Sequence, residues 1–287
     1  MGISNASINS ERGCDTPANA HPAESRVSVE IHPSGFYARN ERMILGAVAV
    51  VLFLTIWEAI GRSGKISPVF LSSPCSIALT ALKMIRSGEI FKHLSASGKE
   101  FFLGFFLAVF LAVPLGLLAG WYRRLNYIFD PFISMFYVTP RIALLPLIML
   151  WLGIGLISKV MVVFLGAFFP ICINVIAGVR TVDRDHLLLA KSFRSNDFHI
   201  LRTIIVPSCL PFILSGLRLA VGRALVGVFV CELYGASAGI GFLISISGMT
   251  FQTDKVFVGI AIMAAFGILC NGIISRAERK MDKWRPQ

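Results

Sequence analysis

Charge is scarce in this chain of 287 residues. Only 15% of the residues are charged, and 27 lysines and arginines outnumber 16 acidic residues, so the formal net charge is +11. Hydrophobic residues make up 55% of the chain and the mean hydropathy is +0.74, values that a soluble domain seldom combines. We therefore expect a membrane protein, in which basic residues mark cytoplasmic loops and not a nucleic-acid-binding surface.

Motifs for catalysis, nucleotide binding and metal binding are also missing. The pairs Gly64-Lys65 and Gly98-Lys99 lack the rest of a P-loop. There is no H-E-x-x-H motif, the five histidines are scattered, and the six cysteines show no C-x-x-C spacing. We expect no catalytic residue, no metal site and no cofactor on the chain itself. Uphill transport would then need an ion gradient or a second polypeptide.

Long apolar runs predict an all-α, polytopic membrane protein with about six transmembrane helices, because about 20 residues cross the hydrocarbon. The predicted spans are Met43–Ile60, Ser97–Trp121, Asp130–Leu152, Ile157–Val179, Cys209–Tyr234 and Lys255–Ser275. Residues 1–40 lack apolar periodicity and are predicted to be a disordered cytoplasmic tail. Residues 41–287 then form one transmembrane domain.

The distribution of basic residues predicts the orientation. Lysines and arginines follow the second, fourth and sixth spans, which places both termini in the cytoplasm. The stretch Arg62–Lys99 fits less well, because it holds six lysines and arginines and should lie outside. We expect a short amphipathic helix at Ser76–Ser87, a possible extra turn at Phe91–Leu94, and a short helix near Ile240–Ile246 in an external loop.

Small residues and prolines distinguish three of the spans. Gly104, Gly116 and Gly120 on the second span let another helix approach closely. Asp130 and Pro131 are expected to cap and begin the third span. Other prolines break or kink helices at membrane depth, which is tolerated where protein or a water-filled cavity satisfies the freed carbonyls. These are Pro140, Pro146 and Pro170.

Rare polar residues within the spans complete a candidate translocation pathway. Arg223 lies well inside the fifth span, where it either attracts an anionic ligand or pairs with a backbone carbonyl. Glu232, nearer the outer end, is interpreted as a gate or packing residue because it would repel an anion. The candidate pathway residues are Pro140, Asn174, Arg223 and Glu232.

An ion-driven carrier or channel is the alternative function. Such a protein needs charged relays within its spans. Arg223 and Glu232 are nine positions apart and lie on opposite faces of a helix. The second, fourth and sixth spans are expected to contain no acidic residue. The sequence therefore favours a protein driven by a second polypeptide.

The segment between the fourth and fifth spans, Arg180–Pro207, is polar and basic but still has a helical rhythm. Two apolar faces predict two short amphipathic helices outside the bilayer, a shape that suits docking. The first face is Leu187, Leu188, Ala190 and Phe193, and the second is Phe198, Leu201, Ile204 and Ile205. A solvated linker and a DNA-binding helix-turn-helix are the competing interpretations, and three aspartates dilute the charge that DNA binding needs.

Arg180–Pro207 resembles the cytoplasmic coupling loop of ABC importer permeases, the binding-protein-dependent inner-membrane components. That loop reads E-A-A, three residues, Gly, nine residues, Ile, one residue, Leu-Pro. Here Leu188-Leu189-Ala190 replaces E-A-A, and Arg194 replaces the turn glycine. An arginine at positive φ costs about 1 kcal/mol, unless the turn forms at Ser195-Asn196. The implied coupling residues are Leu187, Leu188, Leu189, Ala190, Phe193, Arg194, Phe198, Ile204, Val206 and Pro207.

The resemblance covers nearly the whole chain after residue 42 and is to permeases that import nitrate, taurine and aliphatic sulfonates. It is carried by residues 71–82, 129–155, 158–183 and 216–244. It implies a type I importer permease in the cell inner membrane that pairs with a second copy of itself. The other implied partners are an external solute-binding protein and two cytoplasmic ATPases that hold ATP and Mg. The coupling helix would insert Leu187, Ala190, Phe193 and Phe198 into a groove on the ATPase.

Overall fold

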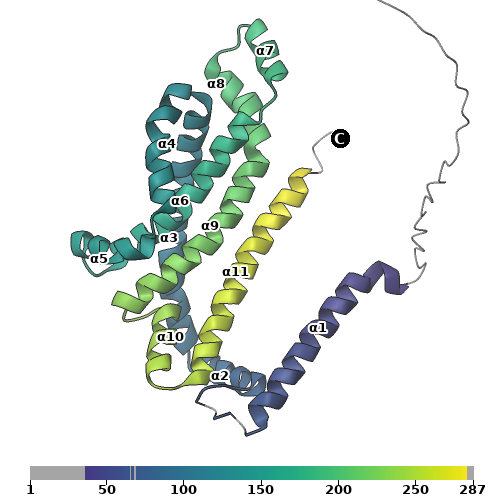
Figure 1. The fold of residues 1–287 in the computed structure, drawn as a ribbon, viewed down its shortest axis with the longest axis vertical. Coiled ribbons are helices and arrows are strands. Elements are labelled where there is room, and N and C mark those ends of the chain that lie inside the picture. Colours follow the sequence, from purple (N-terminus) through teal and green to yellow (C-terminus); the bar gives the residue numbers. More distant parts are fainter. Residues whose placement is uncertain (1–35, 65, 68, 283–287) are drawn as a thin grey trace, which may run out of the picture. The chain divides into compact units, whose positions relative to one another are not determined.

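The computed structural model describes residues 36–64, 66–67 and 69–282 (Figure 1). All regular elements within that part of the chain are helices. They are α1 (Phe36–Arg62), α2 (Pro74–Arg86), α3 (Glu89–Trp121), α4 (Arg123–Val138), α5 (Arg141–Leu152), α6 (Leu156–Arg180), α7 (Arg184–Ser192), α8 (Asp197–Ile200), η1 (Leu201–Ile205), α9 (Val206–Gly235), α10 (Ile240–Met249) and α11 (Thr253–Asp282).

The N-terminal part of the chain forms a separate unit. Its contacts divide the chain into residues up to Leu52 and residues from Phe53 onward, and the second unit is described by itself below. A disordered tail was predicted at residues 1–40. Residues 1–35 of this stretch lie outside the described residues. Helix α1 already begins at Phe36, within the stretch predicted to be disordered.

Within the described residues, five helices are long and apolar enough to cross a membrane. They are Met43–Arg62, Glu89–Trp121, Leu156–Arg180, Asp197–Gly235 and Thr253–Lys280. Helices α4 and α5 make a sixth span if the bent pair is counted as one. The prediction of an all-α protein with about six spans is confirmed.

The third span is broken, not kinked. Helices α4 and α5 meet at 107°, and Thr139 and Pro140 form the extended backbone between them. The predicted start of this span was wrong. Helix α4 begins at Arg123, so Asp130 and Pro131 lie inside it and do not cap it. The polar residues that precede Asp130 still form helix, because charge alone does not end one.

The second span also begins earlier than predicted. Helix α3 starts at Glu89, so Phe91–Leu94 belongs to it and is not a separate turn. Its small residues pack against α6, as their spacing predicted. A Cβ added at Gly104 would lie 2.6 Å from Cβ of Val163 and 2.8 Å from the carbonyl oxygen of Val160. Gly116 and Gly120 make similarly close contacts with α6.

Helices α3, α6 and α9 form the centre of this unit. Their facing sides are filled mostly by small and β-branched residues that are almost fully buried. Figure 1 shows α7 and α8 at one end of these helices and α10 and α2 at the other. We call these the coupling-loop end and the distal end.

Candidate coupling loop and translocation cavity

Helix α7 is a short helix outside the spans, as the pattern predicted. Asp183 begins it, because the Asp183 carboxylate accepts a hydrogen bond of 2.9 Å from the Asp185 amide. Leu187 and Ala190 are partly buried against the central core, so this face of α7 holds the helix on the bundle. Leu188 and Leu189, on the other side, are 63% and 58% exposed.

The turn after α7 is made at Arg194, the position that replaces the family's glycine. Arg194 has φ of +54°, whereas Asn196 has φ of −68°, so the alternative turn at Ser195-Asn196 does not form. The Ser195 amide donates to the Ala190 carbonyl at 3.2 Å and the Arg194 amide to the Lys191 carbonyl at 2.9 Å. This pair of bonds is a Schellman motif. The turn therefore forms with arginine at the position of positive φ, although glycine adopts this conformation with less strain.

The second predicted amphipathic helix is not separate. Helix α8 runs through one π-helical segment, η1, directly into α9, and the three form one apolar helix from Asp197 to Gly235. The inward residues Ile200 and Ile205 are buried, and Ile204 and Val206 are partly buried against the core. The apolar pattern read as a second surface helix is thus the first turns of the fifth span.

Four apolar side chains among the predicted coupling residues are exposed. We call Leu188, Leu189, Phe193 and Phe198 the docking patch. Phe193 is 78% exposed and Phe198 is 69% exposed. Leu187 and Ala190, which we expected to face the ATPase, instead point toward the core. The structure therefore divides the predicted coupling residues into a face that anchors α7 and a face that is free.

Two of the four predicted pathway residues line one cavity of about 260 Å³. Pro140 contributes from the break between α4 and α5, and Arg223 contributes from α9. The other lining residues are Tyr137, Val138, Thr139, Ile142, Val162, Gly166, Val226, Gly227 and Val230. No acidic residue is among this described lining, so Arg223 gives an otherwise uncharged cavity a positive charge. We call this the translocation cavity.

The other two predicted pathway residues lie elsewhere. The Asn174 side-chain amide donates to the Pro170 carbonyl, one turn back on α6, at 2.8 Å. Glu232 is 1% exposed. It accepts hydrogen bonds of 2.6 Å from the Ser97 hydroxyl and from the Gly241 amide. The structure thus does not bring Asn174 or Glu232 into the translocation cavity.

Glu232 belongs to a buried polar cluster that caps α10. The first residues of α10 lack a capping side chain of their own, because Gly239 occupies the N-cap. Side chains from α3 and α9 accept their amide protons. The Gly239 amide donates to Nδ1 of His93 at 3.1 Å, and the Ile240 amide donates to the Ser97 hydroxyl at 2.8 Å. Orphan amides of a buried helix end need such partners.

An ion pair beside this cluster was missed in the sequence. Nζ of Lys159 on α6 lies 2.7 Å from Oε1 of Glu100 on α3, and both side chains are buried. Glu100 also interacts electrostatically with Glu232. The expectation that the second span holds no acidic residue was therefore wrong. Buried charges at this depth are held by pairing across helices, which a single sequence does not show.

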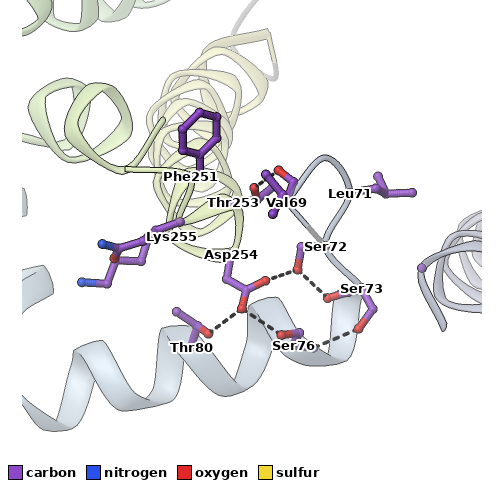
Figure 2. Close-up of a pocket in the computed structure, with 12 residues that line it drawn as sticks. Val69, Leu71, Ser72, Ser73, Ser76, Thr80, Phe251, Thr253, Asp254 and Lys255 are labelled. Atoms are coloured by element: carbon purple, nitrogen blue, oxygen red, sulfur yellow. Dashed lines mark hydrogen bonds between the residues drawn. The ribbon is translucent and has the colours of Figure 1, made fainter. Parts of the chain in front are cut away.

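A cavity of about 530 Å³ opens at the distal end. Figure 2 shows Asp254, at the start of α11, facing the hydroxyl groups of the α2 segment. Ser72, Ser76 and Thr80 all donate to the Asp254 carboxylate, Ser76 at 2.9 Å and Thr80 at 3.4 Å. These bonds hold α2 and the extended segment before it on α11. The predicted helices at 76–87 and 240–246 are confirmed as α2 and α10.

These features define a class of protein. The chain is a polytopic helical membrane protein with an exposed apolar patch on the loop between two spans and a cationic cavity between helices. The family model described as "Binding-protein-dependent transport system inner membrane component" matches residues 112–283. The chain belongs to this family and is the permease component of an ABC importer. No comparison favours the ion-driven alternative.

Curated relatives match along most of the chain. The putative aliphatic sulfonates transport permease protein SsuC of Bacillus subtilis is 38% identical over 240 residues, covering 84% of this chain and 87% of SsuC. The taurine transport system permease protein TauC of Escherichia coli is 31% identical over 252 residues, covering 86% of this chain and 91% of TauC. The identity thus extends well beyond the coupling loop.

Among solved structures, the fold is similar to inward-facing forms of the MetNI methionine ABC transporter. One such chain gives a TM-score of 0.57 at 17% identity, covering 66% of this chain and 94% of that chain. A second gives a TM-score of 0.58 at 15% identity, covering 68% and 98%. At this identity the likeness concerns the fold, and it agrees with the predicted type I importer permease architecture.

Proposed function

We propose that this chain is the membrane subunit of an ATP-driven importer of small anions of the sulfonate or taurine type. Two copies would form the pathway, two cytoplasmic ATPase subunits would bind the docking patches, and a solute-binding protein would deliver the ligand to the distal end. Both termini would then lie in the cytoplasm. Family membership and the names of the relatives support the class of transporter and of ligand.

The docking patch carries the proposal. An apolar face that is more than half exposed outside the membrane is costly unless a partner covers it, since burial gains about 25 cal/mol per Å². Leu188 and Leu189 lie on one helical turn of α7, and Phe193 follows at its end. An apolar helix face of this kind fits a hydrophobic groove on a partner protein. ATP and Mg would be held by that partner.

The translocation cavity supports an anionic ligand. Arg223 is exposed to this cavity, which has no acidic lining residue among those described. An arginine presents several N–H donors in a planar fork that matches sulfonate or carboxylate oxygens. In this assignment Arg223 attracts the anion, and Glu232 serves the cap of α10 and does not contact the ligand. Selection between related anions would rest mainly on the binding protein.

The experiment that tests the proposal changes one exposed residue of the docking patch. Phe193→Asp should abolish co-purification of the ATPase and ATP-dependent uptake, because a carboxylate cannot enter an apolar groove without desolvation. The chain should still insert and fold, since Phe193 is 78% exposed. Uptake is measured in cells that also produce the ATPase that co-purifies with the wild-type chain and a solute-binding protein for the anion.

Phe70→Asp is the matched control. Phe70 is also 78% exposed but lies in the segment before α2, at the distal end. This variant should keep the ATPase bound. Normal ATPase binding by Phe193→Asp, or equal loss in both variants, contradicts the docking role of the patch. Uptake by the purified chain without any ATPase contradicts the proposed function as a whole.

A further inference from the structure

A separate cavity of about 290 Å³ lies at the coupling-loop end and has no part in the roles described above. It is formed where α3 ends, α4 begins and α6 ends. Its polar and aromatic lining consists of Trp121, Arg123, Asn126, Tyr127 and Arg180. No acidic residue is among these described lining residues, so the cavity carries two guanidinium groups without a matching carboxylate.

Other groups strengthen the positive character of this cavity. The Arg123 guanidinium lies 5.3 Å from the centre of the Tyr127 ring, and its Nε donates to the Tyr127 hydroxyl, so the charge lies beside this ring. Nζ of Lys191 lies 5.9 Å from the centre of the Trp121 ring. The cavity also meets the N-terminus of the 16-residue helix α4, which has no side-chain cap. Uncapped amides and the helix dipole favour an anion there.

Asn126 supplies an independent indication of a ligand. Its side chain lines the cavity, and the residue is 8% exposed. Its side-chain carbonyl oxygen is buried and has no hydrogen-bond partner within the described part of the chain. A buried acceptor without a donor is costly, so a rotation of the Asn126 amide that brings this oxygen to a ligand hydroxyl in the cavity would be favourable. The cavity therefore offers donors for anionic oxygens and one acceptor for a hydroxyl.

The surface of α4 next to the cavity suits acyl chains. Ile128, Phe132 and Met135 follow within the next three turns and are each more than half exposed. Trp121 and Tyr127 are of the type that sits at the membrane–water interface. A lipid whose chains lie along α4 would place its headgroup at the cavity. Basic pockets between helices at a membrane surface bind phosphate-containing headgroups.

We propose that this cavity binds an anionic phospholipid headgroup that carries both a phosphodiester and a free hydroxyl, as phosphatidylglycerol does. The phosphate oxygens accept from Arg123 and Arg180, and the hydroxyl donates to Asn126. Arg180 is the first residue of the coupling loop and Lys191 lies on α7, so a bound lipid ties the base of this loop to the membrane surface. This binding site does not depend on the proposed function.

The test measures lipid binding to the purified, delipidated full chain by native mass spectrometry. The wild type should bind phosphatidylglycerol at least tenfold more tightly than phosphatidylcholine. The double variant Arg123→Gln/Arg180→Gln should lose about fivefold in affinity for each arginine. The control Arg124→Gln/Arg184→Gln removes two exposed arginines at the same end that do not line the cavity, and it should keep the preference.

A second variant guards against loss of folding. Asn126→Asp changes one group without changing its size and should weaken phosphatidylglycerol binding by repulsion. Equal binding of this lipid by both double variants, or equal binding of the two lipids by the wild type, overturns the site. Inorganic phosphate at millimolar concentration should not displace the lipid. If it does so in an arginine-dependent way, the cavity binds free anions and the lipid assignment is overturned.

Discussion

Removing the ammonium group of Lys159 gives the most direct test of how the distal half of the bundle is held together. Lys159→Met keeps the apolar stem but leaves Glu100 and Glu232 without the cation beside them. The Lys159 and Glu100 side chains are only 9% and 4% exposed, so water does not replace the lost partner. Breaking a buried ion pair on one side costs about 3–5 kcal/mol. We expect a loss of that size in the free energy of unfolding.

A second substitution should reverse much of this loss. Adding Glu100→Gln to Lys159→Met removes one of the two carboxylates and leaves Glu232 with its bonds to Ser97 and Gly241. Replacing both members of a buried pair is often nearly neutral. The double variant should therefore recover more than half of the stability lost by Lys159→Met alone.

The free cysteines provide the assay. Cys172, Cys209 and Cys231 are fully buried, so a thiol-reactive fluorescent dye reports their exposure on heating. Cys75 is exposed and should be changed to serine to lower the background. At about 2–4 °C per kcal/mol, Lys159→Met should lower the Tm by about 10 °C. A double variant that melts no higher than Lys159→Met refutes the assignment of the ion pair.

Three further predictions concern single positions. Arg194→Gly should slow hydrogen exchange at the turn after α7, because glycine removes about 1 kcal/mol of strain at positive φ. Gly104→Ala should destabilise the chain by about 1–3 kcal/mol in thermal unfolding, because the added Cβ collides with α6. Gly98→Ala is the control and should be neutral or stabilising, because no atom lies within 4 Å of the added Cβ. Arg223→Gln should raise the ligand concentration for half-maximal uptake about 10- to 100-fold. The control Arg202→Gln makes the same change at the coupling-loop end of the helix and should leave this concentration unchanged.

The positions of the spans could be predicted because lipid demands long runs without charge. The ends of the spans could not be predicted. A helix continues beyond the lipid when its polar residues pack against other helices or cap a helix end. The N-terminal turns of α3 show this. His93, Ser97 and Glu100 lie on the same helical face as Gly104, which packs on α6. Polar residues in phase with a small-residue stripe are a signal in the sequence that this face is buried.

The candidate site was predicted in part for a related reason. The spacing of the coupling loop predicted a short helix at α7 and a turn after it, at Arg194 or at Ser195-Asn196, since both features depend on local sequence. The structure forms the turn at Arg194. Periodicity could not show which apolar residues of α7 face the core, because that depends on where α6 and α9 lie. The pairing of Lys159 with Glu100 is likewise a contact between distant segments, 59 positions apart.

The same helices connect the coupling loop to the distal end. Helix α6 has 25 residues, so at 1.5 Å per residue it spans about 37 Å from Leu156 to the start of the loop. Helix α9 returns from the loop to Glu232, which accepts a hydrogen bond from the Gly241 amide in the first turn of α10. Close packing joins α6 to α3, and the Lys159–Glu100 pair fixes their distal ends. Because packed helices move as bodies and do not bend freely, a partner that shifts α7 shifts the distal end as well. The Lys159→Met variant should therefore lower uptake more than it lowers ATPase binding, since it loosens this connection far from the docking patch.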